Sequence, residues 1–183
     1  DEIEYQTNEN IFLVDNVLLF LQKLANYHRN KFNIPLIGIT GSNGKTSSKE
    51  LIKTVLSKKF NVLATEGNLN NHIGVPLTLL NLTIEHEIAI IEMGANRFKD
   101  IEELCQIAEP NYGIITNIGK AHLEGFKNFE GVLKTKLELY HSIQQSQGQI
   151  ILNGDDEILV HSIPKVEVYT YGQNKTNDIV GEL

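Results

Sequence analysis

A glycine-rich segment that ends in lysine and threonine is the feature of this sequence with the clearest chemistry. It reads Gly38-Ile-Thr-Gly-Ser-Asn-Gly-Lys-Thr46 and lies between a short apolar run and a helix-like stretch. In such a loop, backbone N–H groups and the N-terminus of the following helix can hold phosphate oxygens. Lys45 can reach the β and γ phosphates of a nucleotide, and the Thr46 hydroxyl can ligate Mg²⁺. The segment is a variant of the GxxxxGK(S/T) pattern, because Ile39 occupies the position of the first glycine.

The phosphate loop predicts a bound nucleoside triphosphate without identifying the reaction that uses it. Small GTPases, kinases and ATP-driven ligases all remain open. A small GTPase would need a base-reading Asn-Lys-x-Asp late in the chain, and residues 120–183 contain none; the nearest approach, Asn153-Gly-Asp-Asp, lacks the lysine. We expect ATP to be contacted by the residues of the loop itself, which are Gly41, Ser42, Asn43, Gly44, Lys45, Thr46 and Ser47.

Polar side chains also follow the other apolar runs. Glu92 lies at the end of one run and His122 follows another. The carboxyl ends of parallel strands form the usual ligand crevice of such folds, so we expect these side chains near the phosphate loop. Asn68, Asn70 and Asn71 follow a third run and offer uncharged donors and acceptors for a sugar or peptide, although asparagines are also common turn formers.

Three further polar residues follow later strands and are candidates for the nucleotide site. Asn117 lies at the carboxyl end of the run at residues 112–118, where it can contact the nucleotide or a metal-bound water. Asn153 ends the run at residues 148–153 and Asp155 follows it, and we expect both near the adenosine. A simple helix cap formed by Asp155 is an equally good interpretation of that residue.

The chain alternates between short apolar runs and stretches of helical periodicity. The predicted strands are residues 34–40, 62–65, 87–93, 112–118, 148–153 and 166–171. The predicted helices are residues 11–29, 45–59, 73–80, 99–108, 129–145 and a short helix after Asp155. Apolar strands that alternate with helices indicate parallel βαβ units, and unpatterned apolar strands indicate a sheet covered on both faces. We therefore predict an α/β fold with a doubly wound, mostly parallel sheet that carries the P-loop.

Length and composition narrow the classes of protein further. The 183 residues are 41% hydrophobic and 21% charged, which fits a single globular domain. The net charge of -7 argues against a broad surface for nucleic acid or anionic membrane, and no apolar run approaches the ~18 residues of a membrane span. The single cysteine, Cys105, excludes an intramolecular disulfide and fits a reducing cytoplasm. Because the chain starts at Asp1 and its only methionine is Met93, we expect a piece of a longer protein.

Six motifs in order resemble the central ATPase domain of the Mur ligases. They are TGSNGKT (40–46), EGNLNNHIGVPLTLL (66–80), IEMGANRFKDI (91–101), TNIGKAHLEGF (116–126), KTKLELY (134–140) and ILNGDD (151–156). Within this family, the asparagine-rich run and the EMGA motif are most similar to the ligases that add D-alanyl-D-alanine to UDP-N-acetylmuramoyl tripeptide. The resemblance implies that residues 1–183 are a central ATP-binding domain without the N-terminal uridine-nucleotide domain and the C-terminal domain of the family.

The resemblance also implies an activity and its cofactors. Mur ligases form an amide bond by passing the γ-phosphoryl group of ATP to a substrate carboxylate, and an amine then displaces phosphate from the acyl phosphate. Catalysis of this kind depends on positioning and charge neutralisation, so ATP and Mg²⁺ are the expected cofactors. We expect this chain to bind Mg-ATP but not to complete the ligation by itself.

The resemblance assigns roles to individual residues. Lys45, Glu92, His122 and Lys136 correspond to catalytic residues, with Thr46 and Glu92 on one Mg²⁺ and His122 on a second. Lys136 corresponds to the lysine that the family often carries as a carbamate, an anion that can also hold Mg²⁺. Lys134 is two residues away, and a turn of ~200° along a helix lets only one of the two lysines face the site. The asparagine loop is expected to contact the muramoyl peptide.

The implied partners are small molecules. They are UDP-N-acetylmuramoyl peptide and D-alanyl-D-alanine, in a monomeric cytoplasmic enzyme of peptidoglycan synthesis that binds no nucleic acid and does not insert into membranes. Two alternatives stay open. One is another member of the superfamily, such as a ligase for a different amino acid or a folylpolyglutamate synthase. The other is a nucleotide-binding module whose hydrolysis regulates a partner.

Overall fold

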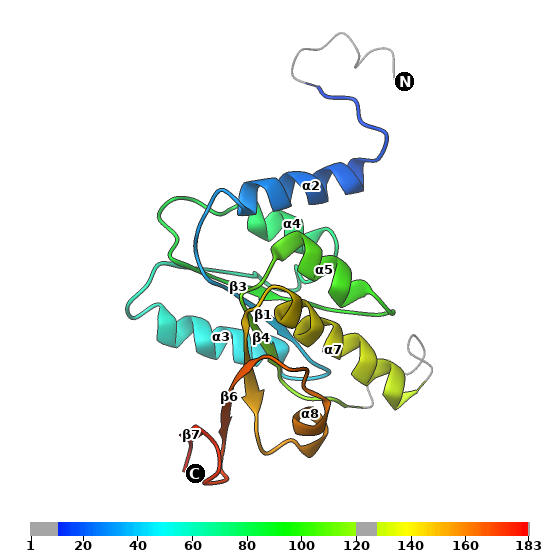
Figure 1. The fold of residues 1–183 in the computed structure, drawn as a ribbon. Coiled ribbons are helices and arrows are strands. Elements are labelled where there is room, and N and C mark those ends of the chain that lie inside the picture. The colour runs from blue at the N-terminus through cyan, green and yellow to red at the C-terminus, as the bar shows by residue number, and fades with distance from the viewer. Residues whose placement is uncertain (1–10, 120–127, 183) are drawn as a thin grey trace.

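The fold is a seven-stranded parallel sheet with helices on both faces (Figure 1). The computed structural model describes residues 11–119 and 128–182. The strands run in the order β2-β3-β1-β4-β5-β6-β7, and every neighbouring pair is parallel. Their bounds are β1 Leu36–Thr40, β2 Val62–Ala64, β3 Ile88–Glu92, β4 Tyr112–Ile115, β5 Gln149–Asn153, β6 Glu167–Gly172 and β7 Ile179–Val180. The predicted doubly wound α/β fold is therefore confirmed.

The helices divide unequally between the two faces of the sheet. On one face, α4, α7 and α8 contact the sheet, and α2 and α5 pack on these helices and share the larger hydrophobic core with them. The other face packs on α3, which covers a smaller core. Figure 1 shows α3 on the opposite side of the sheet from α2, α4 and α5. The bounds of these helices are α2 Val17–Arg29, α3 Lys45–Leu56, α4 Gly74–Leu79, α5 Asp100–Ala108, α7 Phe129–Gln145 and α8 Glu157–Ser162. In the part of the chain that the structure describes, no helix is long and apolar enough to cross a membrane.

The two central strands are apolar throughout because both of their faces are covered. All five residues of β1 are buried, and four of the five in β3 are buried. The register places Ile39 of β1 between Glu92 of β3 and Ile114 of β4. The phosphate loop and the polar residues after β3 and β4 therefore leave the sheet at one common edge.

The structure differs from the prediction in the start of the first helix, in the end of β4 and in one additional strand. The first helix begins at Val17 rather than at residue 11, because the Asn16 side chain accepts a hydrogen bond from the Leu19 backbone over 2.9 Å and caps the helix there. Strand β4 ends at Ile115 rather than at 118, because the next residues turn to contact the phosphate loop. Strand β7 was not predicted, since its two exposed residues form no apolar run.

Candidate active site

The phosphate loop connects β1 to α3, and its glycines permit a backbone that other residues rarely adopt. Gly41 has a φ of 145° and Gly44 a φ of 76°. A Cβ atom at Gly41 would collide with the Thr116 hydroxyl, whereas a Cβ at Gly44 would meet open space. Gly41 is therefore required for two reasons, its φ and its close approach to the end of β4.

Residues after β4 hold the phosphate loop in place. The Ser42 backbone donates to the Asn117 carbonyl over 3.0 Å, and the Asn43 backbone donates to Asn117 Oδ1 over 3.1 Å. Asn117 Nδ2 donates to the Asn43 carbonyl over 2.9 Å, and Thr116 Oγ1 donates to the same carbonyl over 2.6 Å. Both polar atoms of the Asn117 side chain are thus bonded to the loop, so Asn117 positions the phosphate site. A direct contact of Asn117 with nucleotide remains a prediction.

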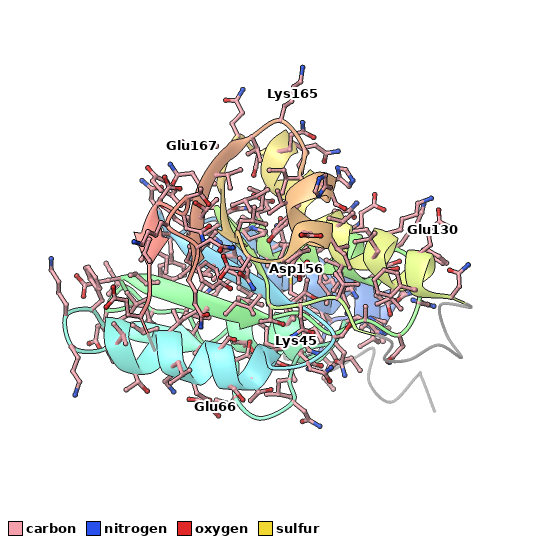
Figure 2. The ribbon with its side chains drawn as sticks, turned by 90° about the horizontal axis from the view of Figure 1, so that it is seen from below. Lys45, Glu66, Glu130, Asp156, Lys165 and Glu167 are labelled. Atoms are coloured by element: carbon pink, nitrogen blue, oxygen red, sulfur yellow. The ribbon has the colours of Figure 1, made fainter. Side chains whose placement is uncertain are left out.

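Lys45 begins α3 and lies over the loop that precedes it (Figure 2). Its Nζ donates to the Gly41 carbonyl over 2.9 Å and to the Ser42 carbonyl over 3.4 Å. Burial lowers the pKa of Lys45, and the Glu92 carboxylate partly opposes that effect. The ammonium is therefore held at the loop whose backbone is suited to phosphate.

Glu92 is the buried carboxylate of the site. It ends β3, is only 1% exposed, and accepts hydrogen bonds from neutral groups. Thr46 Oγ1 donates to Oε2 over 2.9 Å and Asn70 Nδ2 donates to Oε1 over 2.8 Å. No ion pair of Glu92 occurs within the described ranges 11–119 and 128–182. Two hard oxygen donors, the Glu92 carboxylate and the Thr46 hydroxyl, are in contact, and this donor set fits Mg²⁺.

The asparagine-rich loop contributes one side chain to this carboxylate. Asn70 contacts Glu92, and the Asn70 carbonyl accepts from the Gly94 backbone over 2.7 Å. Asn71 instead caps the start of α4, since its Oδ1 accepts from the backbones of Ile73 and Gly74 at 3.0 Å each. Asn68 is exposed. The alternative of a turn-forming asparagine thus fits Asn71, and the proposed contacts of all three with substrate remain predictions.

Lys136 shares a cavity of about 330 Å³ with Lys45. Lys136 is 3% exposed on α7, whereas Lys134 is exposed, so Lys136 is the lysine that faces the site. Burial and the nearby Lys45 lower the pKa of Lys136 to about 8, although Glu138 and Asp100 act in the opposite direction. The cavity is lined by Lys45, Asn70, Asn71, His72, Gly94, Ala95, Asn96, Asp100 and Lys136.

Asn153 and Asp155 do not line this cavity. His122 lies outside the described residues. Asp155 accepts hydrogen bonds from the Gln173 backbone over 2.5 Å, from Asn177 Nδ2 over 2.9 Å and from the Asn174 backbone over 3.2 Å, and these bonds lower its pKa. The interpretation of Asp155 as a helix cap is wrong, because Asp156 caps α8. Asn153 Oδ1 accepts from the Asp155 backbone over 3.1 Å, and adenosine contacts of this pair remain predictions.

Sequence reasoning missed five residues that line the cavity, of which His72, Asn96 and Asp100 have polar side chains. Asp100 is 4% exposed and accepts from the Asn96 and Arg97 backbones over 2.8 and 3.0 Å. Its place at the beginning of α5 was a signal, since acidic residues are favoured at helix N-termini. Nothing in the sequence indicated that this turn folds against α7.

The comparisons with known proteins identify the family of this chain. The family model for the Mur ligase middle domain matches residues 39–182. The chain belongs to the Mur ligase family. This Mur ligase domain is 39% identical over 171 residues to the UDP-N-acetylmuramoyl-tripeptide–D-alanyl-D-alanine ligase of Bacillus subtilis. The match covers 93% of the chain and 37% of that ligase, so the chain spans little more than a third of the relative's length.

Solved structures support the same relationship. The MurF ligase of Thermotoga maritima, in complex with ADP, matches this Mur ligase domain with a TM-score of 0.86 and 34% identity, over 96% of the chain and 41% of that protein. A folylpolyglutamate synthetase from Helicobacter pylori matches with a TM-score of 0.57 and 12% identity, a likeness of fold alone. The Mur ligase domain is thus much more similar to the D-alanyl-D-alanine-adding enzymes than to the folate enzyme.

Proposed function

We propose that this chain is the ATP-binding part of a ligase that adds D-alanyl-D-alanine to UDP-N-acetylmuramoyl tripeptide. The observation that carries the proposal is the contact of buried Glu92 with Thr46 and Asn70, beside a cavity that Lys45 and Lys136 share. The similarity to the Bacillus subtilis ligase and to the ADP-bound Thermotoga maritima enzyme supports the choice of substrates.

In this proposal the acceptor carboxylate attacks the γ-phosphorus of ATP, and the bond from that phosphorus to the bridging oxygen of ADP breaks. The resulting acyl phosphate is attacked by the amine of D-alanyl-D-alanine, which loses a proton as inorganic phosphate leaves. Lys45 and the backbone of the phosphate loop hold the charged oxygens during transfer. Asn70 and the lining of the shared cavity orient the acceptor carboxylate.

Mg²⁺ is part of the proposal because the residues present fit it. Glu92 and Thr46 would hold the ion, with His122 and carbamylated Lys136 at a second position, and it would neutralise charge on the phosphates. A lysine of lowered pKa has more of the neutral amine that reacts with CO₂, which supports the carbamate. We also propose action as a monomer in the cytoplasm, which size-exclusion light scattering and cell fractionation would test.

The experiment is ADP release by the complete polypeptide that carries this chain, with Mg-ATP and UDP-N-acetylmuramoyl tripeptide. D-alanyl-D-alanine is compared with single amino acids and with folate plus glutamate, and Lys45→Ala is the control. We expect release that requires the dipeptide and that Lys45→Ala abolishes. ADP release only with one of the other substrates would contradict D-alanyl-D-alanine as the amine substrate. Equal ADP release without any amine substrate would favour a regulatory ATPase.

A further inference from the structure

Lys49 is a fully buried lysine for which the proposed mechanism has no use. It lies on α3, three residues after Thr46 and outside the phosphate loop, with an exposure of 0%. Removing an ammonium group from water is costly unless strong polar partners replace the water. Two partners are present, the Thr65 carbonyl at 2.6 Å and the Glu50 carboxylate at 2.9 Å. Because the Glu50 side chain is 55% exposed, the shorter bond to Thr65 is the contact made in the protein interior.

Thr65 connects this lysine to the catalytic carboxylate. Thr65 is 1% exposed and follows the last residue of β2. Its carbonyl accepts from Lys49, and its hydroxyl accepts from the Glu92 backbone over 2.9 Å. Its own backbone N–H donates to the Ile90 carbonyl over 3.0 Å, which extends the pairing of β2 with β3. Thr65 is therefore bonded to Lys49 on one side and to the Glu92 segment on the other.

The same residue begins the loop that carries Asn70. That loop leaves Thr65 and returns to β3 at its far end, where the Asn70 carbonyl accepts from Gly94 and the Asn70 side chain donates to Glu92. Lys49 thus fixes the first residue of the loop, and the Glu92 segment fixes its last part. A shift of Thr65 would therefore displace the Glu92 backbone, which donates to the Thr65 hydroxyl, and the Asn70 side chain, which donates to the Glu92 carboxylate.

We infer that Lys49 is a positioning residue for the magnesium-nucleotide site, acting through Thr65 on Glu92 and Asn70. The inference rests on the proposed function, since Glu92 is the proposed Mg²⁺ ligand. Within residues 11–119 and 128–182, the Lys49 side chain has no hydrogen bond or ion pair with a group that would bind nucleotide or metal. Groups that orient metal ligands typically contribute 10–100-fold to metal affinity, which sets the size of the expected effect.

The test measures how Mg²⁺ strengthens ADP binding to the complete polypeptide, using a fluorescent ADP analogue with and without EDTA. The variants are Lys49→Met, which keeps the length of the side chain without its donors, and Thr65→Val, which keeps its shape without the hydroxyl. We expect both to need about 10-fold more Mg²⁺ for half-maximal ADP binding, with affinity in EDTA within about twofold of wild type. The controls are Glu50→Gln, which removes only the charge of the exposed partner of Lys49, and Thr65→Ser, which keeps the hydroxyl. Both are expected to keep the wild-type Mg²⁺ requirement.

The outcomes separate this inference from the proposed function. If Lys49→Met and Thr65→Val keep the wild-type Mg²⁺ requirement, or lose affinity equally with and without Mg²⁺, the positioning role is wrong. If the wild-type protein binds ADP with no Mg²⁺ dependence, the proposed metal site fails and the inference fails with it. Should Lys49→Met not fold, as circular dichroism would show, Thr65→Val can still overturn the inference, because a wild-type Mg²⁺ requirement in that variant would break the route from Lys49 to Glu92.

Discussion

Lys136 on α7 and Lys45 on α3 line one cavity, where burial lowers the pKa of Lys136 and the Lys45 ammonium lowers it further. Together they bring the pKa of Lys136 to about 8, from 10.5 for an unperturbed lysine. The charged form of Lys136 is therefore destabilised in the folded chain, because it has lost contact with water and lies near the positive charge of Lys45. The relationship has a measurable consequence for stability.

Replacing Lys136 by methionine is expected to stabilise the protein at pH 7 by about 3 kcal/mol, because the pKa of Lys136 falls from 10.5 to about 8 and each pKa unit corresponds to ~1.4 kcal/mol. Below pH 8, Lys136 is protonated in both the folded and the unfolded chain, so the full destabilisation by its buried charge is present. Between pH 8 and 10.5 the folded chain binds fewer protons, so wild-type stability rises with pH and the advantage of Lys136→Met shrinks. Urea unfolding from pH 7 to 10 in buffer free of CO₂ and metal measures this. A difference that stays constant with pH would contradict the assignment.

Truncating Glu138 is expected to destabilise the fold. Glu138 on α7 is half-buried and accepts from the backbones of Lys99 and Glu102 over 2.8 and 3.0 Å, at the first turn of α5. Glu138→Ala leaves two helix N–H groups without these acceptors, which we expect to cost about 1–3 kcal/mol of unfolding free energy. Urea unfolding measures the loss, with exposed Lys134→Ala on the same helix as the control. Equal stability of both variants would show that this interhelix cap contributes nothing.

A side chain at Gly41 is expected to weaken nucleotide binding by at least about tenfold. The φ of 145° is unfavourable for an L-residue, and the Cβ of Gly41→Ala meets the Thr116 hydroxyl. The double variant with Thr116→Ala removes that collision while the backbone strain remains, so we expect partial recovery. Calorimetry with Mg-ADP measures both. Gly44→Ala, where a Cβ has open space, is the matched control, and a greater loss there would contradict the steric argument.

Removing the Asn117 side chain tests whether it acts through the loop. Asn117→Ala deletes two hydrogen bonds to Asn43, and at ~0.5–1.5 kcal/mol each we expect about a tenfold loss of Mg-ADP affinity. Because the Asn117 backbone still accepts from Ser42, the loop keeps part of its support. Unchanged affinity would mean that the phosphate loop holds its shape without the Asn117 side chain.

The sequence by itself determined the type of fold and the identity of the phosphate loop. Apolar runs such as those of β1 and β3 predict buried parallel strands, since only strands covered on both faces lack polar alternation. The glycines and Lys45 predict a phosphate site because their chemistry depends on neighbours in sequence. Glu92 and Lys136 were found through motifs, and the lower exposure of Lys136 relative to Lys134 agrees with the motif assignment.

Only the tertiary structure decided what these residues touch. Asn117 bonds to Asn43, 74 residues away, and Glu138 accepts from the backbone of Lys99, 39 residues earlier, at the start of α5. Lys49, an ordinary helix lysine in sequence, is buried because β2 ends beside α3. Such contacts follow from the order of strands in the sheet and from side-chain packing. Local propensity and periodicity carry no information about partners this far apart, which is why the supports of the site were missed while its central residues were predicted.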